Sequence, residues 1–237
     1  MSLLTVPIAD IVAVTPRSRL LCLDLRRHRF PFEAGQAVMA AVNGRPERRP
    51  YSIACSPERA GESSCLELLI ALEEQSDTDR HLSKAAKGEL VDIEGPLGHF
   101  VFPAPLPHGR VLFVAGGTGI APLRAMFDHA LRLPTPPRMA LLYSARRSDE
   151  FAFIDELRTH ARNGHIELHQ TVTRDQSAEW EGSRGRIGRA HFEAVLPEPQ
   201  RTLCFVCGPP LLVTESVASL SELGVPGPLI RTEQWGR

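Results

Sequence analysis

An arginine, an aromatic ring and a hydroxyl group stand close together in the segment Arg49-Pro50-Tyr51-Ser52. A core strand favours β-branched residues, so this extended run is typical of a strand that faces something other than its own core. Alternate side chains of a strand share a face, which lets Arg49 and Tyr51 contact two parts of one ligand while Ser52 turns toward its edge. The guanidinium suits an anionic group and the ring suits a flat apolar one. The alternative is an exposed edge strand with an aromatic plug.

A second chemical signal is the glycine-rich segment GGTGIAP at residues 116–122. It follows an apolar run and opens a helical pattern, so Gly117, Thr118 and Gly119 let backbone N–H groups approach a pyrophosphate at a helix start. Pro122 suits the first helical turn and stands where the G-x-G-x-x-G pattern has its third glycine. A tight turn that binds no ligand is the alternative.

A third signal is the turn Cys207-Gly208-Pro209, which follows a later apolar run. Ligands of open parallel sheets bind beyond the carboxyl ends of the strands. Cys207 is therefore a candidate to border the reacting end of a dinucleotide, and a small buried apolar residue is the alternative. Cys204 and Cys207 form a C-x-x-C, but residues three apart on a strand point to opposite faces and cannot share a metal ion. We expect no metal site and no iron-sulfur cluster.

The residues after two further strand patterns indicate which nicotinamide cofactor to expect. An acidic residue there favours a free ribose 2'-hydroxyl, whereas an arginine accommodates a 2'-phosphate. The sequence places Arg146 after MALLY, Thr173 and Arg174 after IELHQTV, and Arg186 further on. We therefore expect NADPH, with NADH as the alternative because solvated arginines are common on protein surfaces.

The first half of the chain has the pattern of an antiparallel barrel. Six short apolar runs separated by turn signals predict strands at residues 6–14, 19–25, 36–42, 49–55, 65–72 and 89–95. We expect a turn over residues 57–61 and one short helix from Asp79 to Ala86. Six strands and one helix favour a closed six-stranded antiparallel β-barrel.

After the Pro-rich connector at residues 103–109, strand patterns alternate with helical ones. The strand patterns lie at residues 111–115, 139–143, 166–172, 203–207 and 228–232. Such alternation predicts a doubly wound α/β domain around a five-stranded parallel sheet. We place the two domains at residues 1–103 and 104–237.

Composition and net charge limit the number of domains and the kinds of partner that we expect. The 237 residues are 43% hydrophobic, which is enough for two domains with their own cores. A net charge of −1 gives no electrostatic reason to expect nucleic acid or an anionic membrane as the main partner. We see no basic leader and no apolar run near the roughly 18 residues that a membrane span needs. We expect a cytoplasmic protein.

Four motifs in order resemble the ferredoxin-NADP reductase superfamily: R-x-Y-S at residues 49–52, GPLGHF at 95–100, GGTGIAPL at 116–123 and CGPP at 207–210. The likeness spans nearly the whole chain. It implies that the barrel binds a flavin, with Tyr51 against the isoalloxazine ring, Arg49 at the flavin phosphate and Ser52 near the reactive N5. The other flavin contacts that the resemblance implies are Pro50, Leu69, Ile70, Thr78 and Asp79.

The chain departs from the family at one flavin contact and matches it at the tail. Where members have G-x-x-S at the barrel helix, this chain has residues 76–79, with Asp79 in the position of the serine. An aspartate repels a phosphate, which leaves FMN as the alternative to the FAD that we expect. Glu233 and Trp235 match a terminal glutamate and aromatic ring, which implies a proton relay and a gate over the flavin. A frayed tail is the alternative.

The resemblance implies an electron-transfer flavoenzyme. NADPH would deliver a hydride to FAD beside the catalytic candidates Ser52, Cys207 and Glu233, and the flavin would pass single electrons to a separate acceptor, a ferredoxin or an oxygenase component. Two other functions stay open. One is a reductase that uses free flavin as a substrate, and the other is a non-catalytic electron-transfer subunit that senses pyridine nucleotide.

Overall fold

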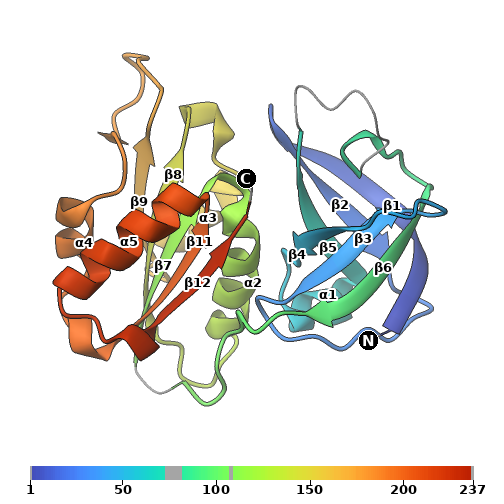
Figure 1. Cartoon of the computed structure of the whole chain (residues 1–237), viewed down its shortest axis with the longest axis horizontal. Helices are drawn as coiled ribbons and strands as arrows, with labels where there is room; N and C mark the ends of the chain where they lie inside the picture. The colour runs from blue at the N-terminus through green and yellow to red at the C-terminus, as the bar shows by residue number, and fades with distance from the viewer. Residues whose placement is uncertain (1, 73–81, 107–108, 236–237) are drawn as a thin grey trace.

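The computed structural model describes residues 2–72, 82–106 and 109–235, which form two lobes (Figure 1). The first lobe is a set of antiparallel strands, and the second is a sheet covered by helices on both faces. The elements of the first lobe are β1 (Ser2–Thr15), β2 (Ser18–Asp24), β3 (Ala37–Val42), β4 (Arg49–Ser52), α1 (Pro57–Ser63), β5 (Cys65–Ala71), the 3-10 turn η1 (Leu82–Lys84) and β6 (Leu90–Leu97).

The strands of the first lobe follow the order β4-β3-β6-β1-β2-β5, and every neighbouring pair is antiparallel. The long strand β1 serves two partners, since residues 2–7 pair with β6 and residues 8–15 pair with β2. A bridge between Ile53 and Leu68 joins the two outer strands and closes the sheet on itself. The predicted six-stranded antiparallel barrel is therefore confirmed.

Helix α1 lies where the sequence predicts only a turn. Ser56 caps it, because its hydroxyl accepts the backbone N–H of Arg59 at 3.1 Å, and Pro57 occupies the first helical position. Seven residues are too few to show a helical period, which is why this helix escapes sequence analysis. Of the helix predicted from Asp79 to Ala86, residues 82–84 form a 3-10 turn and residues 79–81 lie outside the described part of the chain.

The second lobe is a parallel sheet in the order β10-β9-β8-β7-β11-β12. Its elements are β7 (Arg110–Gly116), η2 (Gly117–Gly119), α2 (Ile120–Leu131), β8 (Arg138–Ala145), η3 (Ser148–Glu150), α3 (Ile154–Arg162), β9 (Glu167–Val172), β10 (Ser183–Arg184), α4 (Arg189–Val195), η4 (Pro199–Arg201), β11 (Thr202–Gly208), α5 (Pro210–Glu222), η5 (Gly227–Leu229) and β12 (Ile230–Gln234). Among the described residues, every helix is too short or too polar to cross a membrane.

The parallel sheet has six strands rather than the five predicted. The additional strand is β10, whose two residues pair with Thr171 and Val172 of β9. A two-residue strand carries no periodic signal, so the sequence pattern could not reveal it. The five predicted strands correspond to β7, β8, β9, β11 and β12.

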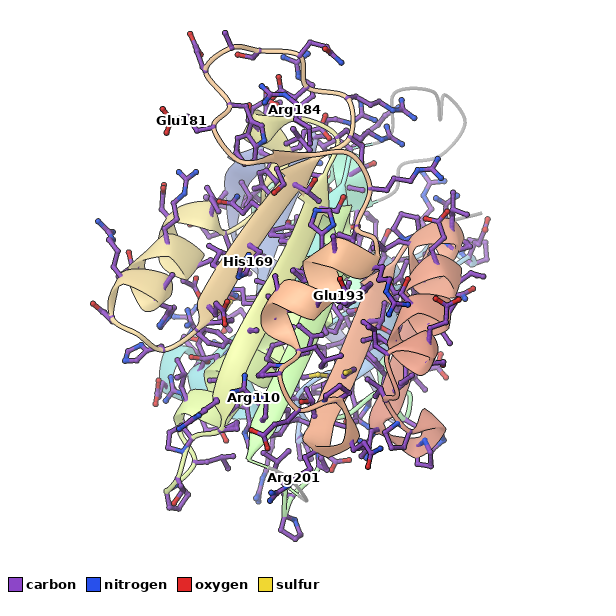
Figure 2. The ribbon with its side chains drawn as sticks, turned by 90° about the vertical axis from the view of Figure 1, so that its left-hand side faces the viewer. Arg110, His169, Glu181, Arg184, Glu193 and Arg201 are labelled. Atoms are coloured by element: carbon purple, nitrogen blue, oxygen red, sulfur yellow. A yellow bond between two sulfur atoms is a disulfide. The ribbon has the colours of Figure 1, made fainter. Side chains whose placement is uncertain are left out.

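Alternate residues of the central strands β7, β8 and β11 enter two different cores. One core packs the sheet against α2, α3 and the barrel, and the other packs it against α4 and α5. Cys207 belongs to the first core and Cys204 to the second, so the two thiols do lie on opposite faces of β11. Figure 2 shows the face that α4 covers, with Arg110 at the amino ends of the strands and Arg184 at the opposite edge.

The connection between the lobes runs from Leu97, the end of β6, to Arg110, the start of β7. Its backbone is attached to the second lobe, since the guanidinium of Arg231 on β12 donates to the carbonyl of Val101 at 2.8 Å. The predicted boundary between residues 103 and 104 falls within this connection and stays a prediction.

A buried arginine joins the two lobes. Arg124 of α2 has a side chain that is 4% exposed, and it donates to the carbonyl of Ala54 at 2.6 Å and to Glu67 of the barrel at 2.5 Å. On its other side it donates to Glu156 of α3 at 2.8 Å. A buried cation that neutralises carboxylates from both lobes holds them in one arrangement, because separating them would leave charges buried without partners.

We expect Arg124→Ala to lower the free energy of unfolding by about 3 kcal/mol or more, because it leaves Glu67 and Glu156 without their shared cation. The matched control is Arg132→Ala on the same helix. Its side chain is 33% exposed and its nearer partner Glu62 is 62% exposed. Its second partner, the buried Asp128 at 3.7 Å, keeps Arg59 as a partner at 3.1 Å, so the expected loss is within about 1 kcal/mol. Urea titrations followed by circular dichroism measure both values. Equal losses in the two variants would contradict this account of the interface.

Candidate active site between the two lobes

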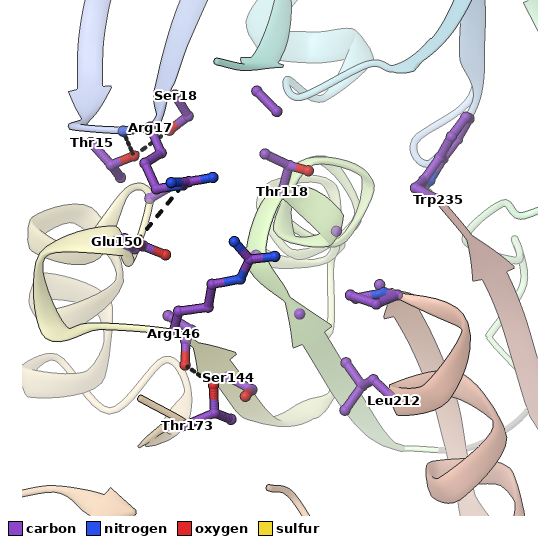
Figure 3. Close-up of a pocket in the computed structure, with 18 of the residues that line it drawn as sticks. Thr15, Arg17, Ser18, Thr118, Ser144, Arg146, Glu150, Thr173, Leu212 and Trp235 are labelled. Carbon is purple, nitrogen blue, oxygen red and sulfur yellow. Dashed lines mark hydrogen bonds and ion pairs between the residues drawn. The ribbon is translucent and has the colours of Figure 1, made fainter. Parts of the chain in front are cut away.

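A cleft of about 440 Å³ lies between the lobes, at the carboxyl ends of the parallel strands (Figure 3). The chain passes from β7 to β8 on one side and later returns to β11 on the other, so the loops after β7 and β11 flank the point where the strand order reverses. Ligands of open α/β sheets bind there. The predicted site residues that line the cleft are Gly117, Thr118, Gly119, Thr173, Arg174, Arg186, Gly208, Pro209 and Trp235.

The glycines after β7 serve two different purposes. A Cβ on Gly119 would lie 2.3 Å from the carbonyl oxygen of Cys207, and one on Gly116 would lie 2.5 Å from the Leu212 side chain. These two glycines let the loops after β7 and β11 pack together. Gly117 instead has a φ of +55°, with open space where a side chain would start, so this residue leaves room for a ligand. Pro122 is buried within α2 and does not line the cleft.

The loops after β8 and β9 bring Arg146 and Arg174 side by side. The backbone N–H of Arg174 donates to the carbonyl of Arg146 at 2.8 Å, which extends the pairing of the two strands beyond their ends. Asp175 holds these loops, because its buried carboxylate accepts the N–H groups of Ser148 and Ser177. The hydrogen bonds from Ser148 and Ser177 lower the pKa of Asp175 to about 2, so the carboxylate stays ionised at neutral pH.

The arginines of the cleft differ in whether a carboxylate already holds them. Arg17, on the turn between β1 and β2, pairs with Glu150 at 3.9 Å, and Arg186 pairs with Glu215 at 3.4 Å. Within the described residues the Arg146 guanidinium has no carboxylate partner, and it points into the cleft (Figure 3). Sequence analysis missed the contribution of Arg17, because nothing local in the sequence places this hairpin against the second lobe.

The three polar side chains of β4 have different surroundings. The Tyr51 ring is half-buried and packs against the barrel core, and Ser52 is buried. Arg49 is half-buried and has no ion pair among the described residues, whereas its neighbour Arg48 pairs with Glu94 at 3.5 Å. A cation without a carboxylate next to an aromatic ring is a donor set that fits a phosphate-bearing flavin.

The remaining predicted flavin contacts are buried side chains, an exposed proline and two residues that the structure does not describe. Leu69 and Ile70 are 5% and 1% exposed, with side chains in the interdomain core and the barrel core, so only their backbone is available to a ligand. Pro50 is exposed. Thr78 and Asp79 lie outside the residues that the structure describes.

The three predicted catalytic residues, Ser52, Cys207 and Glu233, lie close together around the Glu233 carboxylate. Glu233 of β12 accepts hydrogen bonds at the same oxygen from the Ser52 hydroxyl at 3.2 Å and from the Trp235 indole at 2.8 Å. The Cys207 thiol lies 4.0 Å from that oxygen. Burial raises the pKa of Glu233 and raises that of Cys207 well above its usual range. Glu233 therefore keeps its proton to higher pH than an ordinary glutamate, and Cys207 stays a neutral thiol.

The cysteines offer no evident metal chemistry within the described part of the chain. Cys22 and Cys65 form a disulfide between β2 and β5, while Cys55, Cys204 and Cys207 are free and buried. Across the described residues, no cluster of three or more histidine, cysteine, aspartate or glutamate side chains is arranged to hold a metal ion.

Comparison with known proteins assigns the family. Residues 5–102 match the oxidoreductase FAD-binding domain, and residues 113–217 match the oxidoreductase NAD-binding domain. Ferredoxin-NADP reductase B of Sorangium cellulosum is 30% identical over 249 residues, which cover 96% of this chain and 96% of that relative. NADH-cytochrome b5 reductase 1 of Cryptococcus neoformans is 27% identical over 207 residues, which cover 81% of this chain and 67% of that relative.

The cytochrome P450 reductase of Amycolatopsis has a similar structure, with a TM-score of 0.85 and 25% sequence identity over 98% of this chain and 69% of that one. The sequence matches and the structural match therefore agree on both lobes and on their order. The chain belongs to the ferredoxin-NADP reductase superfamily of FAD-binding and NAD(P)-binding oxidoreductases.

Proposed function

We propose that this oxidoreductase takes a hydride from NADPH onto bound FAD and passes electrons one at a time to a separate protein. The observation that carries the proposal is the Glu233 carboxylate, which hydrogen-bonds to Ser52 of the predicted flavin strand and to Trp235 at the wall of the cleft. The Cys207 thiol, expected to border the dinucleotide, lies 4.0 Å from the same oxygen, so residues expected to serve the flavin and a residue expected to border the nucleotide meet at one carboxylate. When bound, FAD supplies the link between a two-electron donor and one-electron acceptors.

On the flavin side, each of the three polar side chains of β4 has a proposed role. Arg49 would bind the flavin phosphate, Tyr51 would pack against the ring system, and Ser52 would donate a hydrogen bond to the flavin. Trp235, which lines the cleft, would cover bound flavin and act as a gate for the nicotinamide. Glu233 supplies and accepts the proton that accompanies electron transfer, and Cys207 packs beside it as a neutral thiol.

On the nucleotide side, the loop at residues 117–119 and the turn at residues 208–209 bind the diphosphate of the dinucleotide. Arg146 and Arg174 bind the 2'-phosphate, with Thr173 beside them, because neither guanidinium has a carboxylate partner among the described residues. Arg186 contributes less, since Glu215 already pairs with it.

The acceptor in this proposal is another protein, a ferredoxin or an oxygenase component. The five cysteines of the sequence include no cluster-binding spacing, so the proposed acceptor lies outside these 237 residues. The names of relatives support the class of partner, since one is a ferredoxin reductase and another a cytochrome reductase. The cytoplasmic location expected from the sequence is part of the same proposal.

An absorption spectrum of the purified protein tests the proposed function. We expect a yellow protein with one FAD per chain, whose flavin absorbance bleaches on anaerobic addition of NADPH. Arg49→Ala should lose most of the flavin, because it removes the cation for the phosphate, while Arg48→Ala should keep it, because Arg48 is engaged with Glu94. A colourless protein that reduces added flavin would instead indicate a free-flavin reductase. A yellow protein that NADPH and NADH do not bleach would indicate a nucleotide-sensing subunit.

Preference for NADPH should depend on the two arginines without carboxylate partners. We expect Arg146→Ala and Arg174→Ala each to raise the Michaelis constant for NADPH roughly 10-fold to 100-fold, the worth of a charge-assisted hydrogen bond to phosphate, with little effect for NADH. Arg147→Ala is the control, because that exposed side chain pairs with Asp149 and does not line the cleft. Steady-state kinetics with both nucleotides measure these values. Equal effects on NADPH and NADH would remove the case for a 2'-phosphate site.

The pH dependence of turnover should report Glu233. Burial raises the pKa of Glu233, so the carboxyl group stays protonated at pH values below that raised pKa. A catalytic step that needs the protonated form should therefore slow as the pH rises through the pKa of Glu233. The same sign applies to folding, so this group costs stability as the pH rises through that pKa. Glu233→Gln should lower kcat roughly 100-fold or more and remove this ionisation from the profile.

The control for that measurement is Glu193→Gln, an exposed residue of α4 that pairs with Arg189 far from the cleft. It should leave both kcat and the pH profile unchanged. A profile that keeps the same ionisation in Glu233→Gln would show that another group supplies the proton.

A further inference from the structure

Tyr143 of β8 lies directly beneath the glycine loop without lining the cleft. Its side chain is completely buried, and its hydroxyl donates to the carbonyl oxygen of Gly117 at 3.1 Å. The ring is held in place by an edge contact with Phe151, whose centroid is 5.0 Å away. Burial raises the pKa of Tyr143, so the hydroxyl keeps its proton and remains a donor throughout the physiological range.

The position of this carbonyl fixes the direction of the next N–H group. In a planar trans peptide the carbonyl and the following N–H point in opposite directions. The Gly117 carbonyl points inward to the Tyr143 hydroxyl and also accepts the N–H of Ile120, so the N–H of Thr118 points outward. Outward from this peptide is the cleft, because Gly117 is exposed and both Gly117 and Thr118 line it.

The same hydroxyl also holds the opposite wall of the cleft. It accepts the backbone N–H of Ala152 at 3.0 Å, and Ala152 lines the cleft from the segment between β8 and α3. This segment carries Glu150, the partner of Arg17 in the barrel hairpin. One buried hydroxyl therefore connects the glycine loop to the segment that faces the first lobe.

We propose that Tyr143 is a positioning residue for dinucleotide binding, whose hydroxyl orients the peptide between Gly117 and Thr118 so that the Thr118 N–H donates to the diphosphate. The inference rests on the proposed dinucleotide site and adds to it a residue that the ligand never touches. A neutral hydrogen bond of this kind corresponds to about a threefold to tenfold change in affinity.

The test uses Tyr143→Phe, which keeps the ring and removes only the hydroxyl. Titration of the flavin-loaded protein with two probes separates the parts of the site. NADP+ contains the diphosphate, whereas adenosine 2'-monophosphate carries only the 2'-phosphate half. We expect the Kd for NADP+ to rise about threefold to tenfold and the Kd for adenosine 2'-monophosphate to stay unchanged. The Michaelis constant for NADPH should rise in parallel with kcat unchanged.

The matched control is Thr202→Val. Its hydroxyl is also fully buried and donates to a backbone carbonyl, that of Glu198 at 2.7 Å, but it lies at the amino end of β11, away from the cleft. It should lose stability without changing either Kd. A second measurement needs no variant, because hydrogen exchange of the wild-type Thr118 amide should slow with NADP+ and not with adenosine 2'-monophosphate.

Equal weakening of both probes in Tyr143→Phe, an unchanged Kd for NADP+, or a Thr118 amide that NADP+ does not protect would each overturn the inference while leaving the proposed function standing. Wild-type protein that binds neither probe would overturn the proposed function, and this inference with it.

Discussion

The buried guanidinium of Arg124 determines how the two lobes meet, and the geometry of the cleft follows from it. The arginine is part of α2, the helix that begins at the glycine loop, and it reaches the barrel at Ala54 and Glu67. The strand that carries Ser52 is only two residues from Ala54. The contact therefore fixes the distance between the predicted flavin strand and α2, which begins at the glycine loop. Arg59 of α1 adds a second link, since it pairs with Asp128 of α2 at 3.1 Å.

In the second lobe, some glycines of the loop after β7 are needed for close packing, and another is needed for its backbone conformation and the open space beside it. Gly116 and Gly119 are required because two loops touch at the switch point of the sheet, and Gly117 is required because its backbone is left-handed and open. A glycine-rich sequence alone does not separate these causes. The arginines of the cleft also fall into two groups. Arg17 and Arg186 already have carboxylate partners, whereas Arg146 and Arg174 have none among the described residues.

Much of this arrangement could be predicted from local patterns. The barrel strands lie in short runs separated by turn signals, and β7, β8 and β11 have continuous apolar cores. β9 and β12 contain polar residues and were predictable from their place in the alternation of strands and helices. Helix α1 and strand β10 were not, because seven and two residues show no period. The motif at residues 49–52 indicated a ligand through residue types that a core strand would not choose.

Features that depend on contacts between distant segments could not be predicted. The pairing of Arg17 with Glu150 joins the two lobes across 133 positions, and the bond from Tyr143 to Gly117 is invisible because a buried tyrosine in an apolar strand looks like any core residue. The shared partner of Ser52 and Trp235 was likewise hidden, although both residues were predicted separately. Tertiary partners, rather than residue types, decide which polar groups are available to a ligand.

The bond between the Trp235 indole and Glu233 couples movement of the ring to the charge of the carboxyl group. The indole N–H favours the ionised carboxylate, so displacement of the ring removes a group that lowers the pKa of Glu233. An event that swings the indole outward while Glu233 stays buried therefore increases the proton affinity of this acid, because burial, the larger cause of its raised pKa, remains. A molecule that displaced the indole in this way on entering the cleft would link its own binding to proton uptake at Glu233.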